Sequence, residues 1–463
     1  MHIRRTIQLT AAVALMVATA FSGPAVAHPP ELDPGQDHEH PVSNPEPDTF
    51  SPGAKHLFNA PRSSAATQSD LAFQGNYAFA GNYNGFRIFD ISDPAHPVLV
   101  KDVWCPGAQN DVSVWGDAII LSVDSVRADS SCSAEASTSP STSGWEGVRV
   151  FSLAKVLTEP QDGDGFTRLD PEANVYTDCG SHTHTGIRDG NCVVVYISSY
   201  PLRGGPSCGP GNEAGKDPLH KVISIVEVPL GNLAGSHLMK TVPIDVPTWN
   251  LLQDPGFNPM QGCHDIQVYP KHNLAAAACA SVGQLWDISD IENPKTMSPK
   301  WQVDEPEVEF YHSAMFNNKA DTVVFGDESI LDNCDDGSGS GQLWFYNRTT
   351  GQRYSSFQIP RVPQNGYCSA HLFYPLAGGN KLVSAWYNGG VTVVDFSDRA
   401  APKEVAFYDP APAVEGEAGL WAAYPYNGYV YSNGLRRGFD SYFIPEARGD
   451  GKHRTHLNPQ TQE

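Results

Sequence analysis

One structural unit recurs along the chain, and it restricts the fold more than any other feature. In "NYAFAGNYNGFRIFDISDPAHPVLVKDVW", which begins at Asn76, we expect strands at 77–80, 86–91 and 98–103. Later copies include "GVRVFSLAKV", "GQLWDISDIENPK", "GQLWFYNRTTGQ" and "GVTVVDFSDRAAPKEVAFYD", and a pair of shorter apolar strands precedes each of these copies. Units of four short strands in fixed order, about forty residues apart, are typical of β-propeller blades.

Counting these units predicts seven blades. They are expected at residues 69–103, 110–176, 182–247, 264–303, 312–360, 371–409 and 420–443. The seventh lacks an outer strand, which residues 55–61 are expected to supply. Insertions rich in Ser and Gly interrupt blades two and three between their second and third strands. The prediction is an all-β, seven-bladed β-propeller with long disulfide-tied loops on one face.

The segments outside the propeller differ in composition. Residues 1–27 combine Arg4 and Arg5, a short apolar run and the cleavage pattern "AVA", which predicts a signal peptide that is removed. Both ordinary secretion and twin-arginine export fit this pattern, so we expect an extracytoplasmic, secreted protein. Residues 28–54, rich in Pro, His and acids, and 446–463 are expected to be a disordered arm and tail around a propeller at 55–445.

The negative net charge limits the kinds of molecule that the protein is expected to bind. The formal net charge is −22, from 30 Lys and Arg against 52 Asp and Glu. An acidic surface repels phosphate groups, so we expect no nucleic acid partner and no association with anionic membranes. After the signal peptide, no segment is apolar enough to be an integral membrane segment.

Histidines recur at one position of the predicted blades. Asn191, Asn273 and Asn380 mark the first turns of blades three, four and six, and a histidine stands nine residues before each; another stands nine before Asp321 in blade five. The first strand of every blade lines the central channel, so these imidazoles are expected at one level. They are His182, His264, His312 and His371. His184 is an alternative to His182, because alternate residues of a strand share a face.

Imidazoles gathered in this way can hold a metal ion. Copper, iron or zinc would suit them, whereas calcium and magnesium prefer oxygen ligands. Asp265 and Glu309 stand beside two of the histidines and are expected to orient an imidazole from behind. The structural alternative is that channel histidines only bind water and neighbouring loops. No catalytic residue can be assigned from the sequence.

The nine cysteines indicate disulfides with one thiol left over. Three cysteines precede the first strand of a blade, and three lie in the insertion of the blade before. The expected pairs are Cys132–Cys179, Cys208–Cys263 and Cys334–Cys368. A hairpin bridge Cys263–Cys279 is the rival pairing. In the first scheme Cys105, Cys192 and Cys279 remain.

The repeats also resemble a known family. "GFRIFDISDPAHPVLV" and its copies resemble the LVIVD repeat, a propeller repeat of exported bacterial and archaeal proteins, over about residues 69–443. This resemblance implies the propeller fold but no common reaction. The wider arrangement is distantly similar to the selenium-binding protein and methanethiol oxidase propellers, and more distantly to the four-histidine carotenoid oxygenases.

These observations leave three functional hypotheses. The first is an exported copper- or iron-dependent oxidoreductase acting on a small molecule at the channel mouth, between loops that carry Arg127 and Arg203. The second is a non-catalytic surface scaffold that binds protein or glycan. The third is a metal-assisted polysaccharide lyase, in which Arg127, Arg203 or Tyr311 neutralises a uronate. The acidic surface weighs against a polyanionic substrate.

Overall fold

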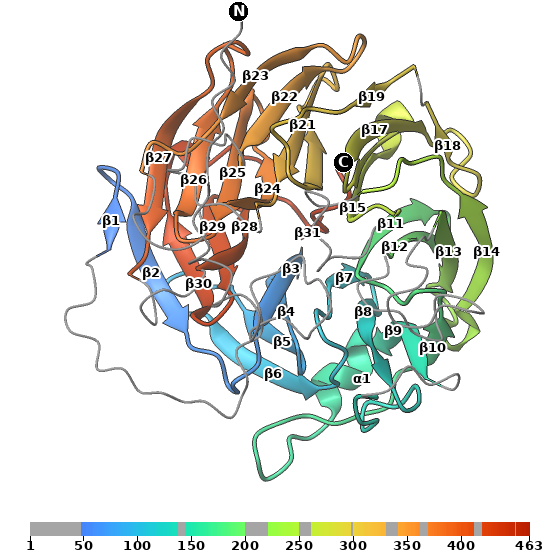
Figure 1. Ribbon diagram of the computed structural model, residues 1–463. Coiled ribbons are helices and arrows are strands. Elements are labelled where there is room, and N and C mark those ends of the chain that lie inside the picture. Colours follow the sequence, from blue (N-terminus) through green and yellow to red (C-terminus); the bar gives the residue numbers. More distant parts are fainter. Residues whose placement is uncertain are drawn as a thin grey trace, which may run out of the picture.

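The computed structural model describes residues 48–137, 144–199, 221–249, 261–297, 300–329, 341–361, 369–411, 419–449 and 451–463. Seven antiparallel sheets stand in a ring around a central axis (Figure 1). In each sheet the main strands follow one another outward from the axis, and the next sheet begins again at the axis. The expected all-β, seven-bladed propeller is therefore confirmed.

The first four blades contain the following strands, from the axis outward. Blade one has β3 (Gln68–Gln74), β4 (Tyr77–Asn82), β5 (Gly85–Asp90) and β6 (Val98–Trp104). Blade two has β7 (Val112–Trp115), β8 (Ala118–Arg127), β9 (Trp145–Ser152) and β10 (Ala173–Tyr176). Blade three has β11 (Thr183–Asp189), β12 (Cys192–Ser198), β13 (Val222–Pro229) and β14 (His237–Pro243). Blade four has β15 (Asp265–Tyr269), β16 (Leu274–Cys279), β17 (Val282–Asp287) and two short outer strands, β18 (Lys295–Thr296) and β19 (Gln302–Val303).

The last three blades follow the same order. Blade five has β20 (Tyr311–Phe316), β21 (Thr322–Asp327), β22 (Leu343–Asn347) and β23 (Arg353–Phe357). Blade six has β24 (Ala370–Pro375), β25 (Lys381–Trp386), β26 (Gly390–Asp395), β27 (Lys403–Asp409) and, outermost, β1 (Thr49–Phe50). Blade seven has β28 (Leu420–Tyr426), β29 (Tyr429–Gly434), β30 (Gly438–Phe443) and β2 (Lys55–Ala60).

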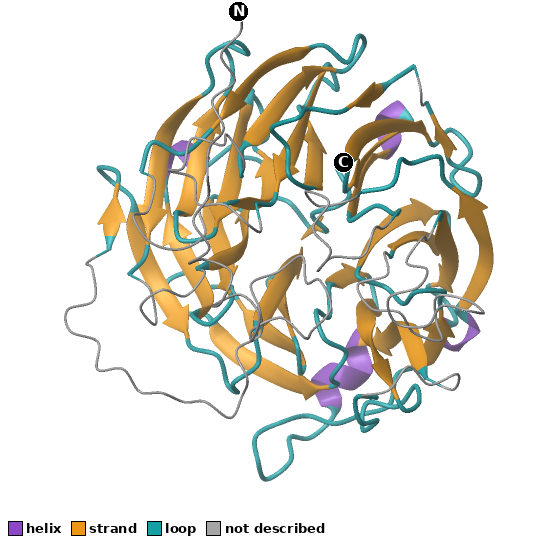
Figure 2. Cartoon of the chain, in the orientation of Figure 1, coloured by secondary structure: helices purple, strands orange, loops and turns teal. Residues whose placement is uncertain are grey.

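Helical structure is minor in the described residues (Figure 2). The α-helix α1 (Leu153–Thr158) follows β9, and Ser152 caps it by accepting a hydrogen bond from Lys155 N. Short 3-10 turns occupy Leu233–Gly235, Pro270–His272 and Pro445–Ala447. No helix of the described chain is both long enough and apolar enough to cross a membrane.

The apolar side chains are buried between blades. The described residues form seven hydrophobic clusters, one at each of the seven gaps in the ring. Ile225 of blade three meets Val268 of blade four in one cluster, and Phe325 of blade five meets Leu285 of blade four in another. Because both faces of a blade are covered, its middle strands read as nearly continuous apolar runs such as "VVVYI" in β12.

The ring is closed by the expected exchange of strands. β2 pairs antiparallel with β30, with Lys55 opposite Phe443 and Ala60 opposite Phe439. The blue strand β2 accordingly lies along the red strand β30 in Figure 1. The N-terminal strand β2 thus completes blade seven, and its pairing with β30 closes the ring.

Two of the expected disordered segments are ordered where the structure describes them. Residues 48–54 were assigned to the arm, but Thr49 pairs with Asp409 and Phe50 with Tyr408 at the edge of blade six. Residues 1–47, which include the expected signal peptide, lie outside the described residues. The tail was expected to be disordered, whereas in the described residues β31 (His456–Leu457) pairs with β3 and residues 457–462 are buried. Polar side chains order this segment, as shown below.

Candidate metal centre

Four histidines of consecutive blades meet at the hub. His182 and His264 directly precede β11 and β15, and His312 and His371 are the second residues of β20 and β24. Successive ring centroids lie 4.6, 3.8 and 4.3 Å apart. Each of these residues has at most 2% of its surface exposed. We call this row the histidine arc. Rotational repetition of the blades has brought together the imidazoles that the turn spacing placed at one level.

Backbone hydrogen bonds fix the positions of two of the four histidines. His182 N donates to Ser198 O at 3.0 Å, and His264 N donates to Ala278 O at 2.7 Å. Each histidine thus extends the hydrogen-bond ladder of its first hairpin by one residue. On the other side of the blade-four hairpin, Asn273 turns the chain with a φ of 53°, a left-handed conformation that Asn tolerates better than most residues.

A chain of hydrogen bonds sets the tautomers in the first half of the arc. His182 Nδ1 lies 2.7 Å from Asp124 Oδ2, so it carries a proton and donates to that carboxylate. Nε2 of His182 therefore accepts from His264 Nε2, 2.9 Å away. This leaves the lone pair of His264 on Nδ1, which faces Asp265 Oδ1 at 3.3 Å.

The second half of the arc surrounds one carboxylate. His371 Nδ1 donates to Trp421 O at 2.6 Å, so its Nε2 carries the lone pair. Glu328 directly follows β21, and its Oε1 lies 3.8 Å from this Nε2. Its Oε2 lies 3.5 Å from His312 Nε2. Tyr387 holds the carboxyl from a third side, because its hydroxyl donates to Oε1 at 3.1 Å.

The electrostatics of the centre favour neutral groups. Burial raises the pKa of Glu328 well above its usual value, and the charges of Glu309 and Asp327 add to this shift. Burial likewise raises the pKa of Asp265 well above normal, with contributions from Asp111 and Asp70. Burial lowers the pKa of His371 to about 3. Burial thus disfavours the charged form of all three groups, and a bound cation would favour the ionised carboxylates.

Two sets of donor atoms are compact enough for an ion. In each set the ligand atoms lie within 4.8 Å of one another: one set is His264, Asp265 and His312, and the other is His312, Glu328 and His371. All of these residues are buried. Two imidazoles and one carboxylate form a common donor set for iron and zinc.

Two of the expected residues have other roles. His184 lies on β11, but Ser113 Oγ is 2.6 Å from its Nε2 and Ser122 Oγ is 2.8 Å from its Nδ1. Both ring nitrogens thus have serine partners between blades two and three, so we do not retain His184 as a ligand. Glu309 accepts a hydrogen bond from Ser329 at 2.8 Å and acts on the centre through its charge. Asp265 Oδ1 lies 3.3 Å from His264 Nδ1.

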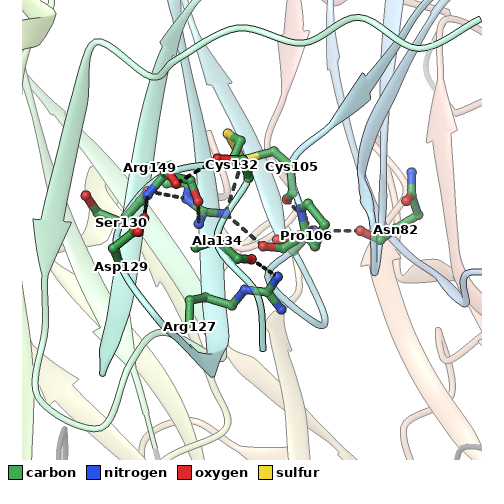
Figure 3. The surroundings of a disulfide bond; sticks show 12 residues. Asn82, Cys105, Pro106, Arg127, Asp129, Ser130, Cys132, Ala134 and Arg149 are labelled. Atoms are coloured by element: carbon green, nitrogen blue, oxygen red, sulfur yellow. Dashed lines mark hydrogen bonds between the residues drawn. A yellow bond between two sulfur atoms is a disulfide. The ribbon is translucent and has the colours of Figure 1, made fainter. Parts of the chain in front are cut away.

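The expected pairing of Cys132 with Cys179 is wrong. Cys132 forms its disulfide with Cys105, which precedes blade two (Figure 3). Arg149 braces this bridge by donating to Pro106 O and Ser131 O, both at 2.9 Å. Burial, with some repulsion from Arg127, lowers the pKa of Arg149 to about 10. The insertion of blade two is thus tied to the start of its own blade.

The expected pairing of Cys208 with Cys263 is also wrong. Cys263 pairs with Cys279 across the first hairpin of blade four, which is the rival pairing considered above. This bridge stands next to His264 and closes the mouth of that hairpin. Cys179 is disulfide-bonded, and Cys192 is a free thiol. The remaining cysteines, Cys208, Cys334 and Cys368, lie outside the described residues.

The sequence did not reveal Glu328 or Asp124. Glu328 lies just beyond a second strand and Asp124 lies within one, whereas the histidine pattern marks only first strands. The signal that could have found Glu328 is the acidic pair Asp327-Glu328 at the end of the apolar run "TVVFG". The residues proposed for a uronate are placed differently: Arg127 donates to Ala134 O inside a loop, and Tyr311 is buried. Arg203 lies outside the described residues.

Comparisons with known proteins agree with the fold. The LVIVD repeat family matches residues 67–104 and 384–410, which lie in blades one and six. No curated protein matches the chain. Among solved structures, the crystal structure of the computationally designed Ika8 protein is 13% identical, covers 84% of this chain and 100% of its own, and has a TM-score of 0.46. That likeness is too weak to carry an argument. The expected similarity to selenium-binding and methanethiol oxidase propellers is not shown.

Proposed function

We propose that this LVIVD-repeat propeller is an exported metalloprotein whose hub binds a divalent transition metal through His312, His371 and Glu328. The observation that carries the proposal is the spacing of these donors. Ligands about 2.1 Å from one ion are themselves about 3.0–3.4 Å apart in octahedral or tetrahedral sites. The two imidazole nitrogens lie 3.5 and 3.8 Å from the oxygens of Glu328, so a small contraction would complete the coordination.

The tautomers and pKa shifts of these groups also support metal binding. His371 Nε2 carries a lone pair because Nδ1 donates to Trp421 O. Burial raises the pKa of Glu328, and a cation bound between the two imidazoles would favour its ionised form. His264 and Asp265 repeat the arrangement one blade away. His264 belongs with Asp265 and His312 to the second compact set of donor atoms.

The donor set narrows the metal to iron, zinc or copper. A single carboxylate with two or more imidazoles favours iron first and zinc second, whereas a purely nitrogenous set would favour copper. We propose iron and an oxidoreductase reaction, because the metal would supply a redox centre in a dry site. The chain's own residues hold the ligands in place: Trp421 orients His371, Asp124 orients His182 and Tyr387 holds Glu328.

Burial favours a small substrate over a macromolecule. The histidines of the arc expose at most 2% of their surface, so a glycan or a protein could not contact them directly. A small molecule that passes between loops could. The two described disulfides and the expected signal peptide support export to an oxidising compartment.

Elemental analysis tests the proposal. Purified protein reconstituted with Fe(II) or Zn(II) and desalted should retain about one ion per chain. The variants His312→Ala and His371→Ala should lose it, and His96→Ala, whose side chain is 82% exposed, is the matched control. Retention below about 0.2 ion per chain in the wild-type protein would end the proposal.

A further inference from the structure

The segment His456–Glu463 enters the central channel instead of leaving the propeller. β31 pairs with β3, the innermost strand of blade one, with Phe73 opposite Leu457 and Gln74 opposite His456. Figure 1 shows β31 and the end of the described chain inside the ring. Residues 457–462 are all buried. We call residues 456–463 the channel segment.

The channel segment binds the inner strands through its amide side chains. Asn458 faces β7: its Oδ1 accepts from Val114 N and its Nδ2 donates to Val114 O, both at 2.8 Å. Gln462 makes the same pair of bonds with Phe316 of β20, at 2.7 and 2.8 Å. Each side-chain amide therefore bonds to both the N–H and the C=O of one inner-strand residue, as a neighbouring strand would.

Backbone bonds and a hydroxyl attach the same segment to two further blades. Val268 N of β15 donates to Gln460 O at 2.9 Å, and Gln462 N returns a bond to Val268 O at 2.8 Å. Thr461 Oγ1 donates to Gly186 O of β11 at 2.7 Å. Together with β31, these contacts bind five consecutive blades. The segment is therefore built into the hub, which a loosely lying tail would not be.

The contacts lie at a different level from the histidine arc. Gly186, Val268 and Phe316 each stand four residues after a histidine of the arc on the same inner strand. At about 3.3 Å per residue, the channel segment lies roughly 13 Å farther along the axis. It therefore occupies the end of the channel away from the start of the inner strands.

Charged groups fix the outer end of the channel segment. His456 Nε2 lies 2.8 Å from Glu463 Oε2. Glu463 also lines a cavity of about 260 Å³ together with Arg188 and Lys271. Two cationic side chains thus line the same cavity as this carboxylate.

From these contacts we infer that the channel segment is a plug that seals one end of the central channel. Access to the hub is then from the face on which the inner strands begin. The inference does not depend on the proposed metal, because every contact above involves the chain alone.

Labelling of metal-free protein with diethyl pyrocarbonate tests the plug. His184 is 1% exposed and lies two residues before Gly186, whose carbonyl accepts the hydrogen bond from Thr461 of the channel segment. Deletion of residues 456–463 should raise the carbethoxylation rate of His184 at least about tenfold, since local opening governs the reactivity of buried groups. His96, 82% exposed, is the internal control and should react equally in both proteins.

A second variant covers the case in which the deletion does not fold. Asn458→Ala combined with Gln462→Ala removes both amide pairs but keeps the segment, and it should raise the His184 rate in the same direction. If a folded deletion or the double variant leaves the His184 rate at the wild-type value, the plug is refuted. Because no metal is present, this result is separate from a failure of metal binding.

Discussion

Nε2 of His182 lies 2.9 Å from Nε2 of His264, although the two residues are 82 positions apart and belong to different blades. One nitrogen must donate and the other must accept. Asp124 decides which, because it takes the Nδ1 proton of His182. The carboxylate of Asp124 in blade two therefore determines which ring nitrogen of His264 in blade four carries the proton.

Removing the imidazole of His264 from this hydrogen-bond chain should destabilise the folded protein. His264→Ala leaves His182 and Asp265 without their imidazole partner in a buried site. We expect the free energy of unfolding of metal-free protein to fall by about 1–3 kcal/mol, as for other buried polar groups that lose a partner. Urea unfolding measures this. His96→Ala should change stability by less than about 0.5 kcal/mol. Equal stabilities of His264→Ala and wild type would contradict a stabilising role for this hydrogen-bond chain.

Asp70 predicts a pH dependence of stability. Burial and the neighbouring Asp111 raise the pKa of Asp70 to about 7, against an ordinary value of 3.8. The folded protein thus holds this proton more tightly than the unfolded chain does. Its stabilising contribution is complete below about pH 4 and is lost as the pH rises to about 7.

Asp70→Asn removes this titration. Between pH 4 and 7 the stability of the variant relative to wild type should rise, by up to about 4 kcal/mol at 1.36 kcal/mol per pH unit. Parallel urea titrations at several pH values measure the slope, which is independent of any constant cost of the substitution. A stability difference that does not change with pH would show that Asp70 titrates normally.

The Cys263–Cys279 bridge should stabilise the hairpin that carries His264. It encloses a sequence separation of 16 residues, for which the chain-entropy model gives about 3 kcal/mol. We expect the double variant Cys263→Ser/Cys279→Ser to lose about that much in thermal or urea unfolding. The matched control is Cys192→Ser, which replaces the free thiol and should have little effect. If the bridge were absent, the double variant and the control would behave alike.

Ring closure depends on a buried carboxylate. Asp440 of β30 has a side chain with 0% exposure, lies 2.7 Å from His56 Nε2 of β2 and accepts from Arg437 Nε at 3.1 Å. Asp440→Ala should lower the free energy of unfolding by about 3–5 kcal/mol, because it strands a partly buried cation at the closing strand. Calorimetry or urea unfolding measures this loss. The exposed Asp170→Ala should be nearly neutral, and similar results for both variants would contradict a closing role for Asp440.

The fold could be predicted because each blade repeats its pattern. Tyr77–Asn82 and its later copies are apolar strands between turns, and one repeat predicts the next. The nine-residue spacing also located the histidine arc, since first strands occupy equivalent places around the axis. Even the closing strand could be inferred, because blade seven lacked its fourth strand while Lys55–Ala60 stood unassigned.

Features that depend on three-dimensional pairing could not be predicted. Cysteine spacing does not fix connectivity, so Cys132 was assigned to Cys179 although it meets Cys105. The channel segment has a single large apolar residue, Leu457, and its composition therefore resembles that of a disordered tail. Its order comes from amide side chains such as Asn458 and Gln462, which need a channel lined with backbone groups. Glu328 was not predicted because it follows the second strand of blade five, whereas the histidine pattern marks only the first strands.

The central claim is that His312, His371 and Glu328 share one metal ion. The most direct measurement is an anomalous difference map from crystals of the reconstituted protein, recorded above and below the absorption edge of the metal. We predict a peak about 2.1 Å from Nε2 of His312 and of His371 and close to the Glu328 carboxylate. A fully loaded crystal with no peak at the hub, or with its only strong peak at the protein surface, would contradict the account.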